Sequence, residues 1–362
     1  MDGKTLKDID LTEANARWPH PWHLVHRASL HKELKRVATS EERPGTPVKL
    51  FPHHRVVKVN DERGATLDNG TVMEADVILG ADGIFSTARK AIKRAFPFPT
   101  GKAAFRFVLP RSLAEADPIT APLVSQKGTL TIWFAKDRRV VMYPCDNNER
   151  LNFVCIHPDT ESQEPRPPFE MFKDASPDNV SEKDPEDSEN SHARIKWSPE
   201  WNKDASLTSV LRVFKGFDPA LTALFSKADP ASIKVWQLMD METLFTWVSS
   251  KLALLGDAAH PCLPYQAQGG AQAIEDAAAL AAVLPLGTDP EVVPERLKLY
   301  ELIRCARAHR IQEYSRLTGQ DWVGGKPVVD MRAFEKYNFD HDEIANATAA
   351  FKKYLATKQG KV

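Results

Sequence analysis

The sequence lacks the features that mark several classes of protein. No apolar run approaches the roughly 20 residues that a membrane-spanning helix needs, and no basic segment followed by an apolar one opens the chain. We therefore expect no membrane span and a cytoplasmic location. The net charge is -1 with 27% charged residues, which argues against nucleic acid as a partner. The four cysteines are scattered without metal-ligand spacing, so we expect reduced, mostly buried thiols and no metal site.

A glycine-rich phosphate-binding turn is missing as well. GxGxxG does not occur in the chain, and residues 1–23 are polar, with no strand that leads into glycines. In Rossmann-like folds that motif binds a dinucleotide pyrophosphate at a helix N-terminus. The sequence offers no such site for the phosphates.

At 362 residues the chain is long enough for one large or two moderate domains, and its most informative stretch is Leu252–Leu284. Leu252–Leu255 predicts a buried strand that breaks at Gly256-Asp257, after which Gly269 and Gly270 open an Ala-rich helix. Free N–H groups and the dipole at a helix start favour an electron-rich ligand, which can lie directly against glycine backbone. Asp257, at the strand end, can accept hydrogen bonds from sugar-like hydroxyls. A turn, a helix lead-in and core alanines are the simpler alternative.

The string GDAAHPCLPYQAQGGAQAIEDAA resembles the second FAD-binding motif of the flavin-dependent aromatic hydroxylases, the family of salicylate hydroxylase and para-hydroxybenzoate hydroxylase. The resemblance implies that Asp257 contacts the ribityl chain, that Pro264 lies by the isoalloxazine, and that Gly269 and Gly270 start the cofactor-facing helix. Ala267 stands where many members have glycine, a difference that we assign to a subfamily.

Two further segments resemble motifs of the same family. In HRASLHKEL we expect a helix that starts near Ser29, and the resemblance places Arg27 near the flavin; the alternative is a solvated arginine beside a helix cap. ADVILGADGIFSTARKAI resembles the family's DG motif, which serves both FAD and the nicotinamide donor. Asp82, Gly83 and Arg89 match it, and a purely structural turn is the alternative.

From Gly101 to about Trp247 the apolar and alternating segments predict an antiparallel sheet. The resemblance implies a substrate domain here, whose sheet covers the flavin ring. Arg106 lies where many members have an arginine or another polar residue that faces the substrate, and Tyr143 is the matching aromatic. A permanently cationic arginine favours phenolate over phenol, and a tyrosine hydroxyl can orient the oxygen. The alternative, with equal support, is that Arg106 projects from the outer face of the sheet and Tyr143 packs in the core.

The expected fold class is α/β, in which the remnant of a Rossmann-like FAD-binding domain joins an antiparallel-sheet substrate domain and C-terminal helices. The expected domains are FAD-binding at 1–100 and 248–320 without the first βαβ unit, substrate-binding at 101–247 with a mobile Pro- and Ser-rich insertion at 158–199, and a C-terminal segment at 321–362.

Two segments around the central motif have simple expected roles. Pro294–Leu317 predicts a long amphipathic helix, and we expect its basic residues Arg304, Arg307 and Arg310 to form a solvated face. His260 is expected to be a structural loop histidine rather than a proton relay.

The resemblance implies an FAD-dependent monooxygenase. In this family NAD(P)H reduces FAD, O₂ adds at the flavin C4a to give a hydroperoxide, and the distal oxygen is transferred to an aromatic ring. The expected partner is a phenolic or aromatic small molecule, the expected setting is secondary metabolism, and a homodimer is the candidate assembly. Because the first βαβ unit is missing, we expect either a fragment of a longer product or a shortened member. The alternative function is a shortened member that does not hold FAD and acts as a non-redox catalyst or as a ligand- or partner-binding pseudoenzyme.

Overall fold

The computed structural model describes residues 3–42, 45–162, 202–323, 326–330 and 332–360. Most of the insertion predicted at 158–199 therefore lies outside the described residues. Its first residues do not: Pro158 ends a strand, and Asp159–Glu161 form a 3₁₀ turn. Within the described part of the chain, no helix is both long and apolar enough to cross a membrane.

A small parallel pair of strands carries the central motif. Strand β12 (Leu252–Leu254) is buried at every position and runs parallel to β4 (Ile78–Gly80), with β11 (Val248–Ser249) on its other side. Gly80 is required at this contact, because a Cβ there would lie 2.6 Å from the Ala88 Cβ. A separate antiparallel sheet comprises β1 (Val56–Asn60), β2 (Gly64–Leu67) and β3 (Val72–Glu74).

The predicted antiparallel sheet is present and has six strands among the described residues. In spatial order these are β6 (Thr131–Phe134), β7 (Arg139–Cys145), β8 (Arg150–Pro158), β5 (Phe98–Pro110), β10 (Lys234–Asp240) and β9 (Asn202–Asp204). One face buries Phe105, Phe107 and Phe153 against α4 (Leu207–Val213) and α5 (Pro219–Phe225). The aromatic residues at every second position therefore form a hydrophobic core on one face of the sheet, and the side chains between them point to the opposite face.

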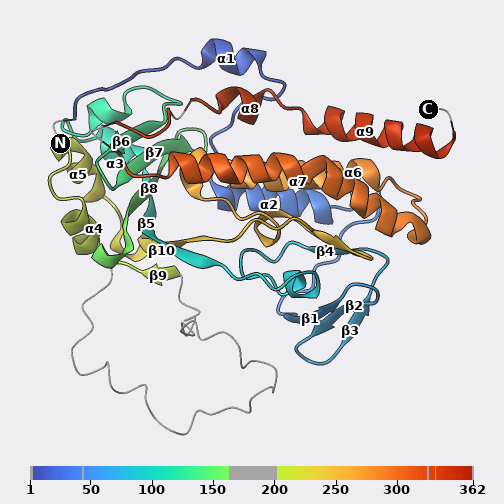
Figure 1. Ribbon diagram of the computed structural model, residues 1–362. Helices are drawn as coiled ribbons and strands as arrows, with labels where there is room; N and C mark the ends of the chain where they lie inside the picture. The colour runs from blue at the N-terminus through green and yellow to red at the C-terminus, as the bar shows by residue number, and fades with distance from the viewer. Residues whose placement is uncertain (1–2, 43–44, 163–201, 324–325, 331, 361–362) are drawn as a thin grey trace, which may run out of the picture.

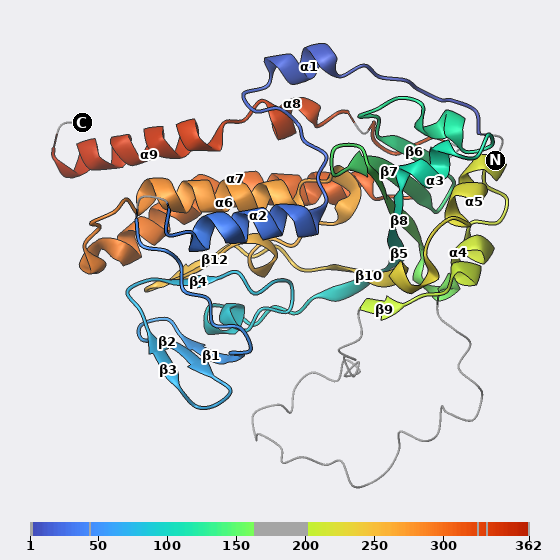
Figure 2. The same ribbon diagram turned by 180° about the vertical axis from the view of Figure 1, so that it is seen from behind.

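Helices form a layer over the parallel pair (Figure 1). Helices α6 (Gly269–Val283) and α7 (Val293–Thr318) pack together, and α9 (Glu343–Lys358) packs on α6. The remaining α-helices among the described residues are α1 (Thr12–Arg17), α2 (Arg27–Thr39), α3 (Arg111–Glu115) and α8 (Glu335–Phe339). Figures 1 and 2 both show α2 alongside α6, with the large sheet at one end of the helical layer.

The helix expected to start near Ser29 begins instead at Arg27, with His26 as its N-cap. The Ser29 hydroxyl does not cap it, because this hydroxyl donates to Asp146 Oδ1 at 2.9 Å. This contact ties the start of α2 to the turn after β7 of the large sheet.

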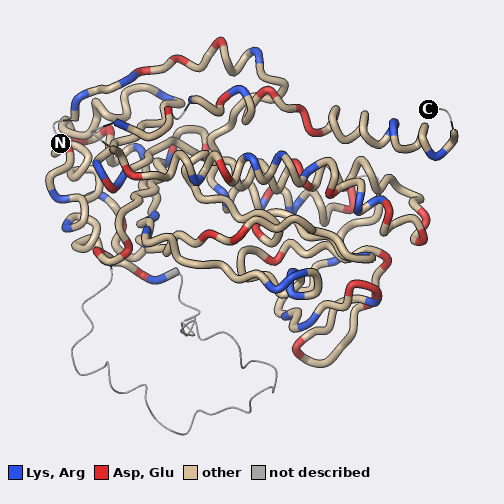
Figure 3. The backbone as a smooth tube through the Cα atoms, viewed as in Figure 1, with Lys and Arg blue, Asp and Glu red and all other residues tan. Residues whose placement is uncertain are grey.

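The expectation of a solvated basic face on α7 is wrong. Arg304 is fully buried and Arg307 is 7% exposed, whereas Arg310 alone of the three lies at the surface, paired with Glu313. Arg304 and Arg307 instead form ion pairs with acidic residues of α6, and Arg304 also pairs with Glu343 of α9. Basic and acidic segments accordingly mix along these helices in Figure 3. The sequence of α7 alone does not show that α8 and α9 pack over this helix.

Candidate functional site

The strand–turn–helix unit of the central motif forms as its sequence predicts. Gly256 has a left-handed φ of +57°, and this turn directs the chain from β12 into the 3₁₀ turn Gly256–Ala258. A second 3₁₀ turn, Pro264–Gln266, precedes α6. Gln268 at the N-cap makes no side-chain capping hydrogen bond, so the first N–H groups of α6 are left without its side chain as an acceptor. This helix end can bind an electron-rich group.

The glycine pair leaves room at the start of α6. A Cβ at Gly270 would meet no atom within 4 Å, and one at Gly269 would meet only the Cys262 Cβ, at 3.8 Å. Both residues therefore permit a ligand to approach the backbone closely.

Asp257 lies in a partly enclosed position beside this helix start. Its side chain is exposed by surface area, yet burial among protein atoms raises the pKa of its carboxyl, while His260 and Arg27 lower it. A carboxylate that solvent reaches from one side and protein encloses on the others has both properties. The charge of Arg27 acts on it, so the two predicted residues belong to one region.

Arg106 and Tyr143 project from the same face of the large sheet. Val154 of β8 lies opposite Arg106 and Asn152 lies opposite Tyr143, and residues two apart in a strand share a face. That face also carries Ala104, two residues before Arg106.

This face is the one that packs on the central motif. Ala104, Ile156 and Leu238 form a cluster with Leu263 and Tyr265, the two residues that flank Pro264. The sheet and the turn that holds Pro264 therefore lie against each other. Arg106 projects from this face of the sheet, toward the central motif, and not from the outer face.

Trp236 connects the two arginines. The Arg106 guanidinium carbon lies 4.6 Å from the centre of its indole ring and that of Arg27 lies 5.4 Å away. Trp236 is in register with Ala104 and so belongs to the site face. No motif marks this tryptophan, and its role follows only from the strand pairing.

Arg106 is a cation without an acidic partner among the described residues. Its buried Nε atom makes no hydrogen bond within this part of the chain. Burial, and next the charge of Arg27, lower its pKa. Burial raises the pKa of Tyr143, against the opposing effect of Arg106, so the tyrosine hydroxyl is protonated at neutral pH and can donate. Two cations and a hydroxyl facing an aromatic ring fit an anionic or electron-rich aromatic ligand.

The DG motif forms a turn whose polar groups bond within the protein. The Asp82 carboxylate accepts from the Ser86 hydroxyl and from the backbone N–H groups of Thr87, at 2.6 Å, and Ala88, at 3.0 Å. Gly83 has φ +78° with open space beside it. Arg89 is buried and donates to the Ala258 carbonyl at 3.0 Å, which joins this turn to the central motif. Asp82 and Arg89 thus have structural contacts, and the roles inferred from the family remain predictions.

His260 is a buried structural residue, as expected. It is 1% exposed, and its Nε2 lies 2.7 Å from Asp276 Oδ2. Asp276 lies in the Ala-rich helix α6, next to Glu275, and no motif in the sequence marks this acidic pair.

Known proteins place the chain in a family. Residues 41–315 match the model of an FAD binding domain. The chain is 31% identical to FAD-dependent monooxygenase phomE of Diaporthe leptostromiformis, over 96% of this chain and 88% of the relative. It is 30% identical to hispidin-3-hydroxylase of Neonothopanus nambi, over 85% and 68%.

A solved structure shares the fold. A salicylate hydroxylase substrate complex aligns with a TM-score of 0.65 at 24% identity, over 90% of this chain and 75% of that one. With the sequence match over three quarters of its length, the chain belongs to the FAD binding domain family, among FAD-dependent monooxygenases.

Proposed function

We propose that this chain hydroxylates a phenolic small molecule with FAD, O₂ and NAD(P)H. The observation that carries the proposal is Arg106, whose Nε atom is buried and makes no hydrogen bond within the described part of the chain. Arg106 lies over Trp236 and shares with Tyr143 the sheet face that packs on the central motif. The relatives' names support an aromatic substrate, since one is a hydroxylase of hispidin.

The residues at the central motif fit FAD. The uncapped start of α6 and the open space at Gly270 suit the electron-rich edge of an isoalloxazine, and Asp257 suits the hydroxyls of a ribityl chain. Pro264 would lie beside the ring because its neighbours are fixed on the large sheet. When bound, the flavin supplies the electron transfer and the activation of oxygen. Arg27, with its effect on Asp257, would line the same region.

The protein's own groups would prepare the substrate. Arg106 would stabilise a phenolate or an adjacent carboxylate, which makes the ring more electron-rich and therefore more reactive toward an electrophilic oxygen. Tyr143 would donate a hydrogen bond to that oxygen and fix its orientation, and Trp236 would form an apolar wall. The contacts of Leu263 and Tyr265 with the sheet would keep water from that side.

A second candidate rests on the absence of GxGxxG from the sequence, because that motif holds the pyrophosphate in Rossmann-like folds. A chain that binds an aromatic ligand at the same sheet face without flavin would act as a non-redox catalyst or as a ligand- or partner-binding protein.

The test combines three measurements on purified protein. FAD binding is followed by the change in flavin fluorescence, NAD(P)H consumption is measured with salicylate and 3-hydroxybenzoate as probes, and salicylate binding is titrated directly. The variant Arg106→Met should weaken salicylate binding by roughly tenfold to a hundredfold, the loss expected for a hydrogen bond to a charged group. Arg310→Met, an exposed arginine, is the control.

The outcomes separate the two candidates. FAD uptake, with NAD(P)H consumption that the probes stimulate, supports the hydroxylase. Protein that ignores saturating FAD but binds salicylate through Arg106 supports the second candidate and refutes the first. Equal salicylate affinity in both arginine variants would refute the assigned role of Arg106.

A further inference from the structure

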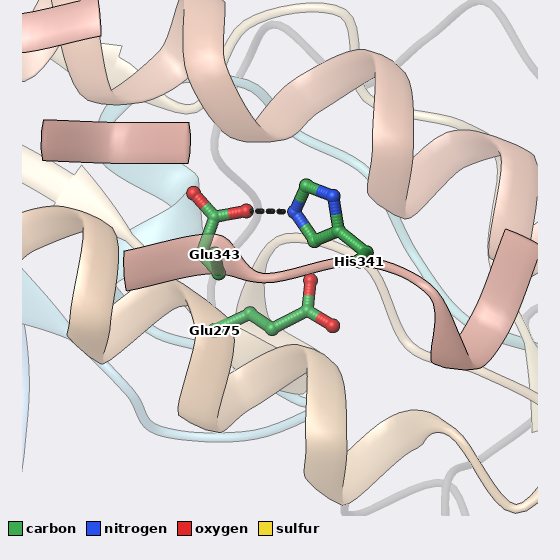
Figure 4. Close-up of side chains that lie close together, drawn as sticks. All are labelled: Glu275, His341 and Glu343. Carbon is green, nitrogen blue, oxygen red and sulfur yellow. Dashed lines mark hydrogen bonds and ion pairs between the residues drawn. The ribbon is translucent and has the colours of Figure 1, made fainter. Parts of the chain in front are cut away.

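A partly buried cluster of acidic and basic groups lies behind the central motif, outside the site described above. Glu275, His341 and Glu343 bring one ligand atom each within 4.8 Å of one another. Figure 4 shows these three side chains close together. The cation between the two carboxylates is Arg304: its Nη1 lies 2.5 Å from Glu275 Oε2 and 3.0 Å from Glu343 Oε2. Because Arg304 is fully buried and already neutralises these groups, the cluster is an internal ion network and not a metal site.

The network leads directly to the turn that precedes Asp257. The Arg304 Nε donates to Asp276 Oδ1 at 2.9 Å, and Asp276 Oδ2 accepts from the Gly256 N–H at 2.8 Å. The same carboxylate oxygen bonds His260. Glu343 at the start of α9 is therefore joined to Gly256 through two side chains. The left-handed turn at Gly256 has no side chain of its own to hold it, so this hydrogen bond is a direct restraint on it.

A second connection reaches the turn that contains Pro264. Asn338 Nδ2 donates to Gln266 Oε1 at 2.8 Å, and Gln266 Nε2 donates to the Thr318 hydroxyl at 2.6 Å. Arg307 fixes Asn338 from the other side, since its guanidinium donates to the Asn338 carbonyl at 3.3 Å and to Glu275. Asn338 is 7% exposed, so water does not readily replace these bonds.

We propose that Asn338 and Glu343 of the C-terminal segment are positioning residues for the two cofactor turns. Both lie beyond residues 41–315, the part that matches the family model. Charged hydrogen bonds in a low-dielectric interior are strong, and loss of Glu343 removes one of the three carboxylates that hold the Arg304 guanidinium in place. Loss of Glu343 should therefore loosen the Gly256 turn through Arg304 and Asp276, whereas loss of Asn338 should loosen the Pro264 turn. The inference rests on the proposed function only for its effect on FAD.

The test begins without cofactor, so that it does not depend on flavin binding. Hydrogen exchange is measured in peptides that cover 252–262 and 263–268, in Glu343→Gln, Asn338→Ala and the control Lys358→Met. Lys358 belongs to α9 but pairs at the surface with Glu295, away from the network. We expect roughly tenfold faster exchange in 252–262 for Glu343→Gln and in 263–268 for Asn338→Ala, with neither change in Lys358→Met.

FAD affinity is then measured at a temperature at which urea titration shows each apo-variant to be folded. The two network variants should bind FAD several-fold more weakly, with an altered visible circular dichroism of any bound flavin, and Glu343→Asp should restore part of the affinity. Wild-type exchange in both peptides would overturn the inference. If Glu343→Gln does not fold, Asn338→Ala alone decides, because it removes an uncharged side chain. Failure of the wild-type protein to bind FAD would refute the proposed function but leave the exchange result standing.

Discussion

Acid should destabilise this protein through a histidine on the face of the large sheet opposite to the candidate site. His157 is completely buried on the aromatic face of the large sheet, stacked on Phe105 with ring centres 4.4 Å apart. Its Nδ1 lies 3.0 Å from the Cys155 carbonyl, while its buried Nε2 has no partner among the described residues. Burial lowers the pKa of His157 from 6.5 to about 4. The imidazole is therefore neutral in the folded protein at pH values where it is protonated in the unfolded chain.

The sign and size of the effect follow from linkage. Because the folded pKa lies below the unfolded one, the unfolded state binds more protons as the pH falls from 6.5 toward 4, and stability decreases across that window. With these two pKa values the loss is about 2 kcal/mol between pH 7 and pH 5 and about 3 kcal/mol by pH 4. Above about pH 7.5 the contribution is nearly complete and should change little further.

The variant His157→Phe isolates this contribution. Phenylalanine keeps a ring against Phe105 but cannot titrate, so loss of the bond to Cys155 should cost about 1 kcal/mol at all pH values. Urea unfolding at pH 7, 6 and 5 should give free energies of unfolding for wild type and variant that converge as the pH falls. Below the pH at which they are equal, the variant should be the more stable protein. His31→Gln, an exposed histidine, controls for removal of a histidine as such. Parallel profiles for wild type and His157→Phe would refute the linkage.

Two glycine substitutions give further predictions. Gly319→Ala should destabilise the fold by about 1–3 kcal/mol in urea unfolding, because the added Cβ would lie 2.4 Å from the Tyr265 ring. The backbone φ of -76° suits alanine, so the loss would come from packing alone. Unchanged stability would contradict this packing. Gly270→Ala should leave stability unchanged or raise it by up to about 1 kcal/mol, since nothing lies within 4 Å, yet weaken FAD binding; full FAD affinity would show that no ligand lies against that backbone.

Local patterns predicted the elements that depend on neighbours in sequence. The apolar run of β12 and the glycine pair that opens α6 each carry their own signal, and each is present. The motif string also led to the correct family, since the residues of a strand–turn–helix unit are contiguous.

Features set by distant packing were not predictable in the same way. The face from which Arg106 projects depends on pairing with β8 and on the turn around Pro264, some 150 residues away. Trp236 has no motif at all. Arg304 and Arg307 of α7 were wrongly expected to face solvent. Their acidic partners lie on α6 and α9, and the residue pattern within α7 does not show that these helices pack on it. The homodimer, the domain limits and the individual site roles remain predictions.

The position of β4 has a practical consequence. Among the described residues this strand is hydrogen-bonded on one side only, to β12, and its Leu79 is 49% exposed. An open strand margin next to an apolar side chain recruits further strands, so self-association will increase with protein concentration. Samples for the binding and exchange measurements are best kept dilute, and Leu79→Lys would place a charge at that open strand margin.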